Sequence, residues 1–210
     1  MRPLVVATRN RGKLYELRAM FAATDLEVID VAEAEVRLGV TIPDTVEDAP
    51  TFVGNAGKKA REVAGATGWP ALADDSGLEV DALGGAPGVY SARYAGGHGD
   101  TAANNAKLLA ALVGVPPERR TAQFRCVLAV ADPAGLLGGE LMTAEGVVRG
   151  TLLESPRGTG GFGYDPLFFS PELGLTFAEA DRDAKAAVSH RGRALASLLP
   201  HLQTYLALGR

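Results

Sequence analysis

The chain has 210 residues, of which 47% are hydrophobic and 22% are charged, as in a globular protein that buries a substantial core. Its formal net charge of −4 argues against a nucleic-acid polymer as a partner, because proteins that bind such polymers usually carry a clear basic excess. No apolar run approaches the roughly 20 residues that a membrane-spanning helix needs, so we expect no membrane partner.

Cysteine usage and the first residues indicate the compartment. Cys126 is the only cysteine, which excludes an internal disulfide framework and a cysteine-based metal cluster. It stands in an apolar run, where a buried structural thiol is expected. The opening residues lack the apolar length and the cleavage site of a signal peptide, so we expect a cytoplasmic protein.

The chain opens with a predicted strand, a polar turn and a helix. The run of residues 3–8 is short, apolar and rich in β-branched side chains, which is typical of a buried strand. A polar turn follows at residues 9–13, and Leu14, Leu17 and Phe21 then recur on one face of a helix.

A strand, an irregular stretch and a second helix are expected next. Residues 28–31 are apolar and favour a strand, whereas residues 33–50 contain two of the chain's prolines and are predicted to be irregular. Thr51 is a suitable N-cap for a helix that runs to about Ala66.

Strands and helices alternate through the rest of the chain. Residues 71–73 form a short apolar strand that is expected to end at Asp74 and Asp75. The remaining predicted elements are an ordered glycine-rich loop at 84–99, a helix at 101–112, strands at 123–131 and 141–149, a glycine turn at 158–163 and a helix at 182–199. This interleaving predicts an α/β fold, an elongated mixed sheet flanked by helices in two lobes, and without a clean linker residues 1–210 form one domain.

The turn at residues 8–13 is a candidate phosphate site. A turn between a strand and a helix N-terminus presents unpaired backbone N–H groups and the positive end of the helix dipole. Its members are Thr8, Arg9, Asn10, Arg11, Gly12 and Lys13. The segment is not a P-loop, which needs two glycines ahead of Lys-Ser/Thr. A solvated turn with surface cations is the alternative interpretation.

Asp74 and Asp75 are candidate metal ligands. Two adjacent carboxylates after an apolar strand are costly unless they are paired or bind a cation. Successive residues of a strand point to opposite faces, so the two need not share one role. Mg²⁺ prefers one or two carboxylates, several waters and substrate phosphates. The alternative is an Asx turn that ends the strand.

Two later segments offer contacts to a planar base. In the segment 160–166, glycines allow close backbone approach, and Phe162 and Tyr164 provide aromatic faces beside Asp165. If residues 182–199 form one helix, Lys185 and Ser189 share a face, and Lys185 and Arg191 could clamp phosphates or be surface charges.

Of the histidines, only His190 is a candidate substrate contact. His190 is a candidate donor to a base carbonyl or a structural histidine, next to the cation of Arg191. His98 and His201 have no carboxylate or histidine at metal-ligand spacing, so we interpret them as structural or surface residues.

Together these segments resemble the inosine triphosphate pyrophosphatase family, also called XTP/dITP diphosphatases. The run 73–83, continued through 87–96, is similar to that family's longest signature. The other similar segments stand in the family's order: Thr8 to Lys13, Asn55-Ala56 with Lys59-Ala60, Phe162 to Asp165, and Lys185 with Ser189-His190-Arg191. The resemblance covers nearly the whole chain.

The resemblance implies an enzyme that hydrolyses ITP, dITP and XTP to the monophosphate and pyrophosphate. It implies a homodimer with a substrate cleft between two lobes, and Mg²⁺ as the cofactor. Asp75 would be the general base and a metal contact, with Asp74 close by. The remaining implied substrate contacts are Thr8, Arg9, Asn10, Arg11, Gly12, Lys13 and Ser76 for the phosphates, Phe162, Gly163, Tyr164, Asp165, His190 and Arg191 for the purine, and Lys185 for the substrate's polar groups.

The sequence departs from the family pattern at two places. The family usually has a metal-associated Glu at the position of Gly54, and Glu47, Asp48 or water would have to replace it. The pair Asp183-Ala184, where the family usually has two acidic residues, is a lesser change.

Two alternatives remain open. If Gly54 in place of the family's Glu relaxes selection among bases, the enzyme would also hydrolyse ordinary or modified nucleoside triphosphates. A substrate panel decides this. A nucleotide sensor without catalysis would lack an acid at position 75, whereas Asp75 is present.

Overall fold

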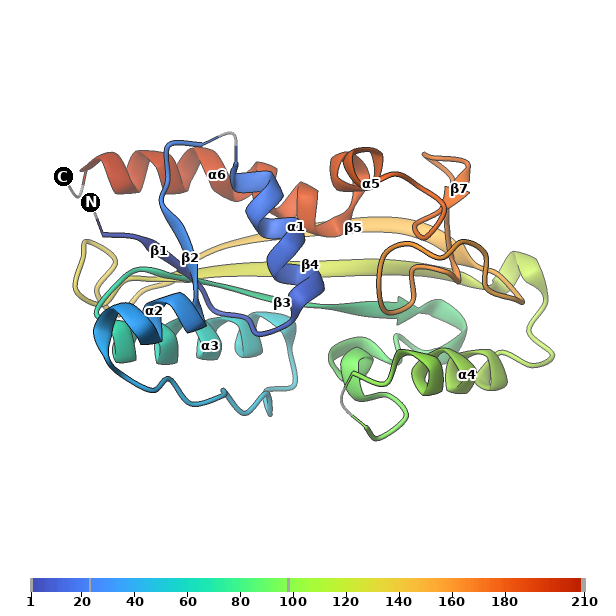
Figure 1. Ribbon diagram of the computed structural model, residues 1–210. Helices are drawn as coiled ribbons and strands as arrows, with labels where there is room; N and C mark the ends of the chain where they lie inside the picture. Colours follow the sequence, from blue (N-terminus) through green and yellow to red (C-terminus); the bar gives the residue numbers. More distant parts are fainter. Residues whose placement is uncertain (1, 23, 98, 209–210) are drawn as a thin grey trace. The chain divides into compact units, whose positions relative to one another are not determined.

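The computed structural model describes residues 2–22, 24–97 and 99–208, and its centre is one seven-stranded sheet (Figure 1). The strands follow the spatial order β2-β1-β3-β4-β5-β6-β7. They are β1 (Leu4–Val6), β2 (Val28–Asp30), β3 (Ala71–Val80), β4 (Thr121–Ala131), β5 (Met142–Leu152), β6 (Phe168–Ser170) and β7 (Leu175–Thr176).

The described residues also form six α-helices and three short 3₁₀ helices, of which α5 and α6 follow the last strand. The α-helices are α1 (Arg11–Phe21), α2 (Val31–Leu38), α3 (Phe52–Thr67), α4 (Thr101–Ala111), α5 (Arg182–Val188) and α6 (His190–Leu208). The 3₁₀ helices are η1 (Asp81–Leu83), η2 (Gly88–Arg93) and η3 (Pro117–Arg119). None of the described helices is long and apolar enough to cross a membrane.

The sheet is mixed, as predicted. Strand β1 runs parallel to both of its neighbours, with Val5 paired to Ile29 of β2 and to Ala71 of β3. Strands β5, β6 and β7 pair antiparallel. The α/β class with a mixed sheet is therefore confirmed.

The chain divides into two compact units. Unit 1 comprises residues 1–75, 127–145 and 194–210, and unit 2 comprises residues 76–126 and 146–193. Strands β3, β4 and β5 each begin in one unit and end in the other, so no linker separates the two in sequence. The expected substrate cleft stays a prediction.

Unit 1 has an apolar core built on β1. All three residues of this strand are buried, and α1 contributes Leu17 and Phe21, two of the residues predicted to share its apolar face. Helix α3 begins where the sequence predicts, because the Thr51 side chain accepts a hydrogen bond from the backbone N–H of Gly54. It ends at Gly68, whose φ of 68° is readily adopted only without a Cβ.

Unit 2 has its own core, which is rich in aromatic rings. Phe124 lies 4.7 Å from Phe168 and 5.9 Å from Phe177 between ring centroids, and Phe168 lies 5.0 Å from Phe177. The core also includes Leu78 and Val80, which belong to the second half of β3. Cys126, on β4, is buried and forms no disulfide.

The prediction that residues 33–50 are irregular is wrong for their first part, which forms α2. Asp30 and Glu33 make a capping box, each side chain accepting from the other's backbone N–H, and Gly39 ends the helix in the left-handed conformation. The pattern Asp-x-x-Glu before apolar residues indicates the start of this helix, and the prolines at 43 and 50 lie beyond its end.

The prediction that β3 ends at the two aspartates is also wrong. The strand continues through Asp74 and Asp75 to Val80, and both carboxylates are buried, at 1% and 4% exposure. An Asx turn at this point is therefore excluded. A buried carboxylate in mid-strand needs cations or donors around it, which the surrounding residues of unit 1 provide.

The predicted single helix at 182–199 is two helices. Helix α5 ends at Ser189, whose ψ of 157° is extended, and α6 begins at His190. Lys185 and Ser189 therefore do not share one face of a continuous helix. Gly192 permits this break, since a Cβ there would lie only 1.9 Å from the carbonyl oxygen of Ala186. The predicted loop at 84–99 likewise contains the 3₁₀ helix η2.

Candidate active site

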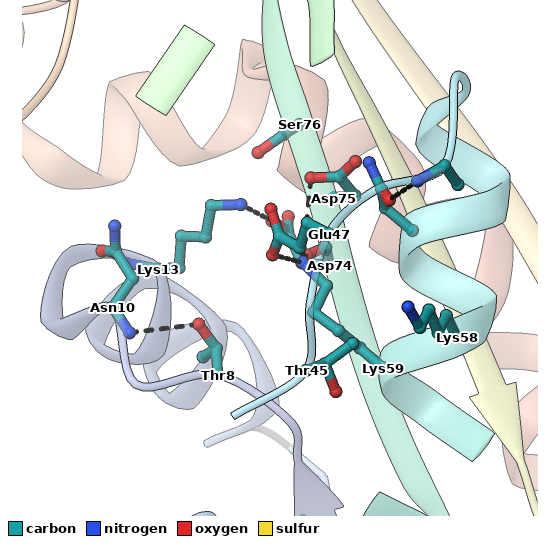
Figure 2. A network of polar contacts seen from close by, with 12 residues as sticks. Thr8, Asn10, Lys13, Thr45, Glu47, Lys58, Lys59, Asp74, Asp75 and Ser76 are labelled. Atoms are coloured by element: carbon teal, nitrogen blue, oxygen red, sulfur yellow. Dashed lines mark hydrogen bonds and ion pairs between the residues drawn. The ribbon is translucent and has the colours of Figure 1, made fainter. Parts of the chain in front are cut away.

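The first candidate site residues form a cluster of alternating charges in unit 1 (Figure 2). Lys13, from the first turn of α1, makes an ion pair with Asp74 of β3. Asn10 caps α1 by accepting a hydrogen bond from the backbone N–H of Lys13 at 3.1 Å, and Thr8 accepts from that of Asn10 at 3.2 Å. The turn at 8–13 thus sets Lys13 beside the carboxylates of β3.

The two arginines of this turn are placed differently. Arg9 donates to Asp44 at 2.7 Å, to Glu35 at 2.9 Å and to the carbonyl of Ile42 at 2.9 Å, so it holds the segment after α2. Arg11 is exposed on the first residue of α1, next to Gly12. Roles for Arg9, Arg11 and Gly12 in phosphate binding stay predictions.

Lys59 is a member of the cluster to which the sequence analysis gave no role. Its ammonium donates to Glu47 Oε1 at 2.6 Å and to the backbone carbonyl of Asp74 at 2.7 Å, and it lies 3.7 Å from Asp75 Oδ1. The signal was present, since Lys59 falls on the buried face of α3 with Asn55 and Val63. A lysine on an apolar helical face needs anionic partners.

Asp75 is buried among charged groups that shift its pKa in both directions. Burial raises the pKa of its carboxyl group, Lys59 and Lys13 lower the pKa, and the neighbouring Glu47 and Asp74 raise it further. Its Oδ2 atom is buried and has no hydrogen-bond partner among the described residues. The carboxylate therefore keeps one acceptor atom that the described protein groups do not use, as a general base or a cation ligand requires.

The cluster also answers which nearby carboxylate accompanies Asp75. Glu47 reaches Lys59, and its charge is felt at Asp75, whereas Asp48 pairs with Lys58 at 2.8 Å and is 67% exposed. Glu47 is thus the one placed within the cluster, and Asp48 is not.

The carboxylates of the cluster suit a hard cation that needs few ligands from the protein. No group of three or more His, Cys, Asp or Glu side chains in the described residues is arranged to hold a metal ion by itself. Mg²⁺ does not need such a cage, because it takes one or two carboxylates and fills the rest with water and phosphate oxygens. The unpartnered Oδ2 of Asp75 fits that requirement.

Gly54, where the sequence departs from the family pattern, lies in a tightly packed place. A Cβ at position 54 would lie 2.8 Å from the Cβ of Ala49 and 3.0 Å from the Thr51 hydroxyl. Gly65, on the same helix, has open space around its would-be Cβ.

We expect Gly54→Ala to lower the free energy of unfolding by about 1–3 kcal/mol through overpacking. Its control, Gly65→Ala, should raise the same quantity by about 0.5–1 kcal/mol through helix propensity. Urea titration of both variants measures the difference. Equal stabilisation by both would mean that residues 49–51 move aside without cost.

A second group of predicted residues meets in unit 2, around Asp165. Its Oδ2 accepts from the backbone N–H of Phe162 at 2.8 Å and from Lys185 Nζ at 2.6 Å. The Lys185 ammonium also lies 5.0 Å from the centre of the Phe162 ring and 5.6 Å from that of Phe177. Gly161 makes room, because a Cβ there would lie 2.1 Å from Asp165 Oδ2.

His190 and Arg191 belong to the same group. His190 is buried and stacks on Phe124, with ring centroids 4.9 Å apart and planes 13° from parallel. Arg191 is 1% exposed, donates to the Ser76 hydroxyl at 3.0 Å and lies 5.8 Å from the Phe162 ring centre. Ser76 is thus bound to a residue of the group.

Tyr164 and Gly163 stabilise the loop to which they belong, residues 161–165, which we call the aromatic loop. The Tyr164 hydroxyl is buried, donates to the Ser91 carbonyl at 2.9 Å and has its pKa raised by burial. The Gly163 carbonyl accepts from the amide of Asn105 at 3.0 Å. Their direct contacts to a base stay predictions. His201 is exposed, as predicted, and His98 lies outside the described residues.

Comparisons with known proteins agree over nearly the full length. The Ham1 family model matches residues 4–201. A dITP/XTP pyrophosphatase of Geobacter sulfurreducens is 54% identical over 202 residues, which is 96% of this chain and 97% of that protein. A dITP/XTP pyrophosphatase of Desulforamulus reducens is 53% identical over 192 residues, or 91% of each.

Solved structures give the same result. A HAM1 protein from Coxiella burnetii matches with a TM-score of 0.85 and 40% identity, over 97% of this chain and 100% of that chain. A nucleoside-triphosphatase / dITP/XTP pyrophosphatase from Mycobacterium abscessus matches with a TM-score of 0.73 and 44% identity, over 94% and 99%. The chain belongs to the Ham1 family.

Proposed function

We propose that this protein hydrolyses XTP, dITP and ITP to the nucleoside monophosphate and pyrophosphate, and so removes deaminated purine nucleotides from the precursor pool. Relatives that are 53–54% identical over nearly the whole chain carry the name dITP/XTP pyrophosphatase. The single observation that carries the proposal is Asp75, a buried carboxylate with an unpartnered oxygen among two lysines and two further acids.

Asp75 would act as the general base. A water molecule attacks the α-phosphorus, its proton passes to the Asp75 carboxylate, and the α–β phosphoanhydride bond breaks to release pyrophosphate. The raised pKa suits this role, because a base that is too acidic takes a proton weakly. Lys59 would hold Asp75 and Glu47 in place through its ammonium.

The phosphates would be bound by the other side of the cluster. Lys13 and the N-terminus of α1 offer one cation and several backbone donors, and these stabilise negative charge on phosphate oxygens. Asp75, with Glu47 and Asp74 nearby, would hold Mg²⁺, which supplies further charge stabilisation for the phosphates when it is bound.

The group around Asp165 would take the purine. The ring of Phe162 offers a face for stacking, and His190 and Arg191 offer donors. A site that donates to a 6-oxo group accepts hypoxanthine and xanthine and meets a mismatched amino group in adenine. We further propose that the protein acts as a cytoplasmic homodimer.

The test is a substrate panel. Pyrophosphate release is measured with Mg²⁺ on XTP, dITP, ITP, GTP and ATP, and we expect at least tenfold higher kcat/KM on the first three. Excess chelator should stop the reaction, and added Mg²⁺ should restore it. Similar rates on all five would replace the proposal by a broad-range pyrophosphatase, and binding without turnover would favour a sensor. Turnover that persists in excess chelator would contradict the proposed role of Mg²⁺.

A further inference from the structure

Helix α4 reaches the aromatic loop through one side chain. The Nδ2 of Asn105 donates to the carbonyl oxygen of Gly163 at 3.0 Å, across 58 positions of sequence. Gly163 has a φ of +63° and stands between Phe162 and Tyr164. The other end of the Asn105 amide, Oδ1, is buried and has no hydrogen-bond partner in the described part of the chain.

This asparagine is a poor choice for stability alone. Asn has a lower helix propensity than Leu or Ala, and a buried acceptor without a partner adds a further cost. Its neighbour Asn104 differs, because it uses both amide atoms, accepting from the backbone N–H of Ala95 at 2.7 Å and donating to the Ala92 carbonyl at 3.3 Å. Asn104 therefore serves local structure, whereas the bond made by Asn105 serves the loop.

The loop that Asn105 holds carries the group proposed to bind the purine. Glycines at 160, 161 and 163 give this segment conformational freedom, and the conformation in the structure places the Phe162 ring beside Lys185. The bonds from Asn105 to Gly163 and from Tyr164 to Ser91 fix its middle. The apparent Kd of a ligand equals its intrinsic Kd divided by the fraction of molecules that are in the competent conformation.

We propose that Asn105 is a positioning residue that holds the loop at residues 161–165 in the conformation that binds the purine. The assignment rests on the proposed function, since it takes a purine nucleotide as the ligand. Asn105 acts through Gly163 and the ring of Phe162, so it governs recognition of the base and leaves binding of the phosphates unchanged.

The test compares Asn105→Leu with the wild type, using ligands that separate the base from the phosphates. Losing one hydrogen bond of about 1–2 kcal/mol should raise the Kd of XMP and the KM of XTP by about 5- to 30-fold, with kcat within about twofold. The Kd of inorganic tripolyphosphate should stay unchanged. The melting temperature should stay equal or rise.

Three variants sharpen the result. Ala106→Asn puts the same side chain on the next, exposed position of α4 and should change nothing. Asn105→Gln keeps an amide donor and should recover part of the XMP affinity. In a Phe162→Ala background, Asn105→Leu should add little to the loss, because residues that act through one another are not additive.

Two results would overturn the proposal. An unchanged XMP affinity in Asn105→Leu would show that the loop does not depend on this bond. A lower melting temperature with equal losses for XMP and tripolyphosphate would show a structural role only. Binding of XMP is measured without turnover, so a wild type that binds XMP but does not hydrolyse XTP would end the proposed function while the comparison still decides this one.

Discussion

Replacing Asp75 with asparagine is expected to lower kcat for XTP by about 10²- to 10⁴-fold while the protein stays folded. The change removes the proton acceptor and keeps the shape of the side chain. Because burial disfavours the charged carboxylate, the neutral amide should leave stability at neutral pH equal or higher. Turnover and urea unfolding of the same sample measure both quantities.

The pH profile gives a second reading of the same residue. Only the ionised carboxylate accepts a proton, so kcat/KM should rise with pH through the pKa of Asp75 and fall below it. Since burial raises that pKa in the protein without metal, the acidic limb should lie above the ordinary value of about 4 for an aspartate when Mg²⁺ does not saturate the site. Two results would contradict the role of Asp75 as the base. One is residual activity of Asp75→Asn above a few per cent, and the other is an acidic limb of the profile at the ordinary pKa of an aspartate.

Replacing Lys185 with methionine is expected to lower the free energy of unfolding by about 3–5 kcal/mol. The Lys185 ammonium lies 2.6 Å from Asp165 Oδ2, and the two side chains are 8% and 5% exposed. Removing the cation takes away the ammonium that pairs with the buried carboxylate of Asp165, although the backbone N–H of Phe162 still donates to it. Because small domains are stable by only about 5–15 kcal/mol, the loss is large, and equilibrium urea unfolding measures it.

A matched double variant shows whether charge is the cause. Lys185→Met combined with Asp165→Asn removes both charges, so most of the lost stability should return although the ion pair is gone. Affinity for XMP should remain low in both variants, because each lacks the cation beside Phe162. A cost of less than about 1 kcal/mol in Lys185→Met would mean that the pair is well solvated, contrary to its burial.

Local signals predicted most of the fold correctly. Thr51 as an N-cap and the apolar spacing of Leu17 and Phe21 depend on residues within one or two turns, and both were confirmed. The capping box at Asp30 was equally local, but the prediction gave more weight to Pro43 and Pro50, which lie beyond the helix. The sequence therefore predicts an element well where its own caps decide, and less well where several weak signals compete.

The errors arose where distant residues decide. Strand β3 continues through Asp74 and Asp75 because lysines from α1 and α3 compensate their charges, and these lysines lie far from the aspartates in sequence. The break at Ser189 depends on the close approach of Gly192 to Ala186, which no periodicity contains. Asn105 was missed for the same reason, since its partner Gly163 is 58 residues away.

The surroundings of Lys59 bear on which replacements this protein tolerates. Three oxygen atoms converge on one ammonium at 2.6, 2.7 and 3.7 Å, an arrangement suited to a compact charge with three rotating donors. The planar fork of an arginine has the same charge but a different shape and greater bulk. At this position a substitution that appears conservative by charge is therefore a radical one, and only the geometry of the donors distinguishes the two.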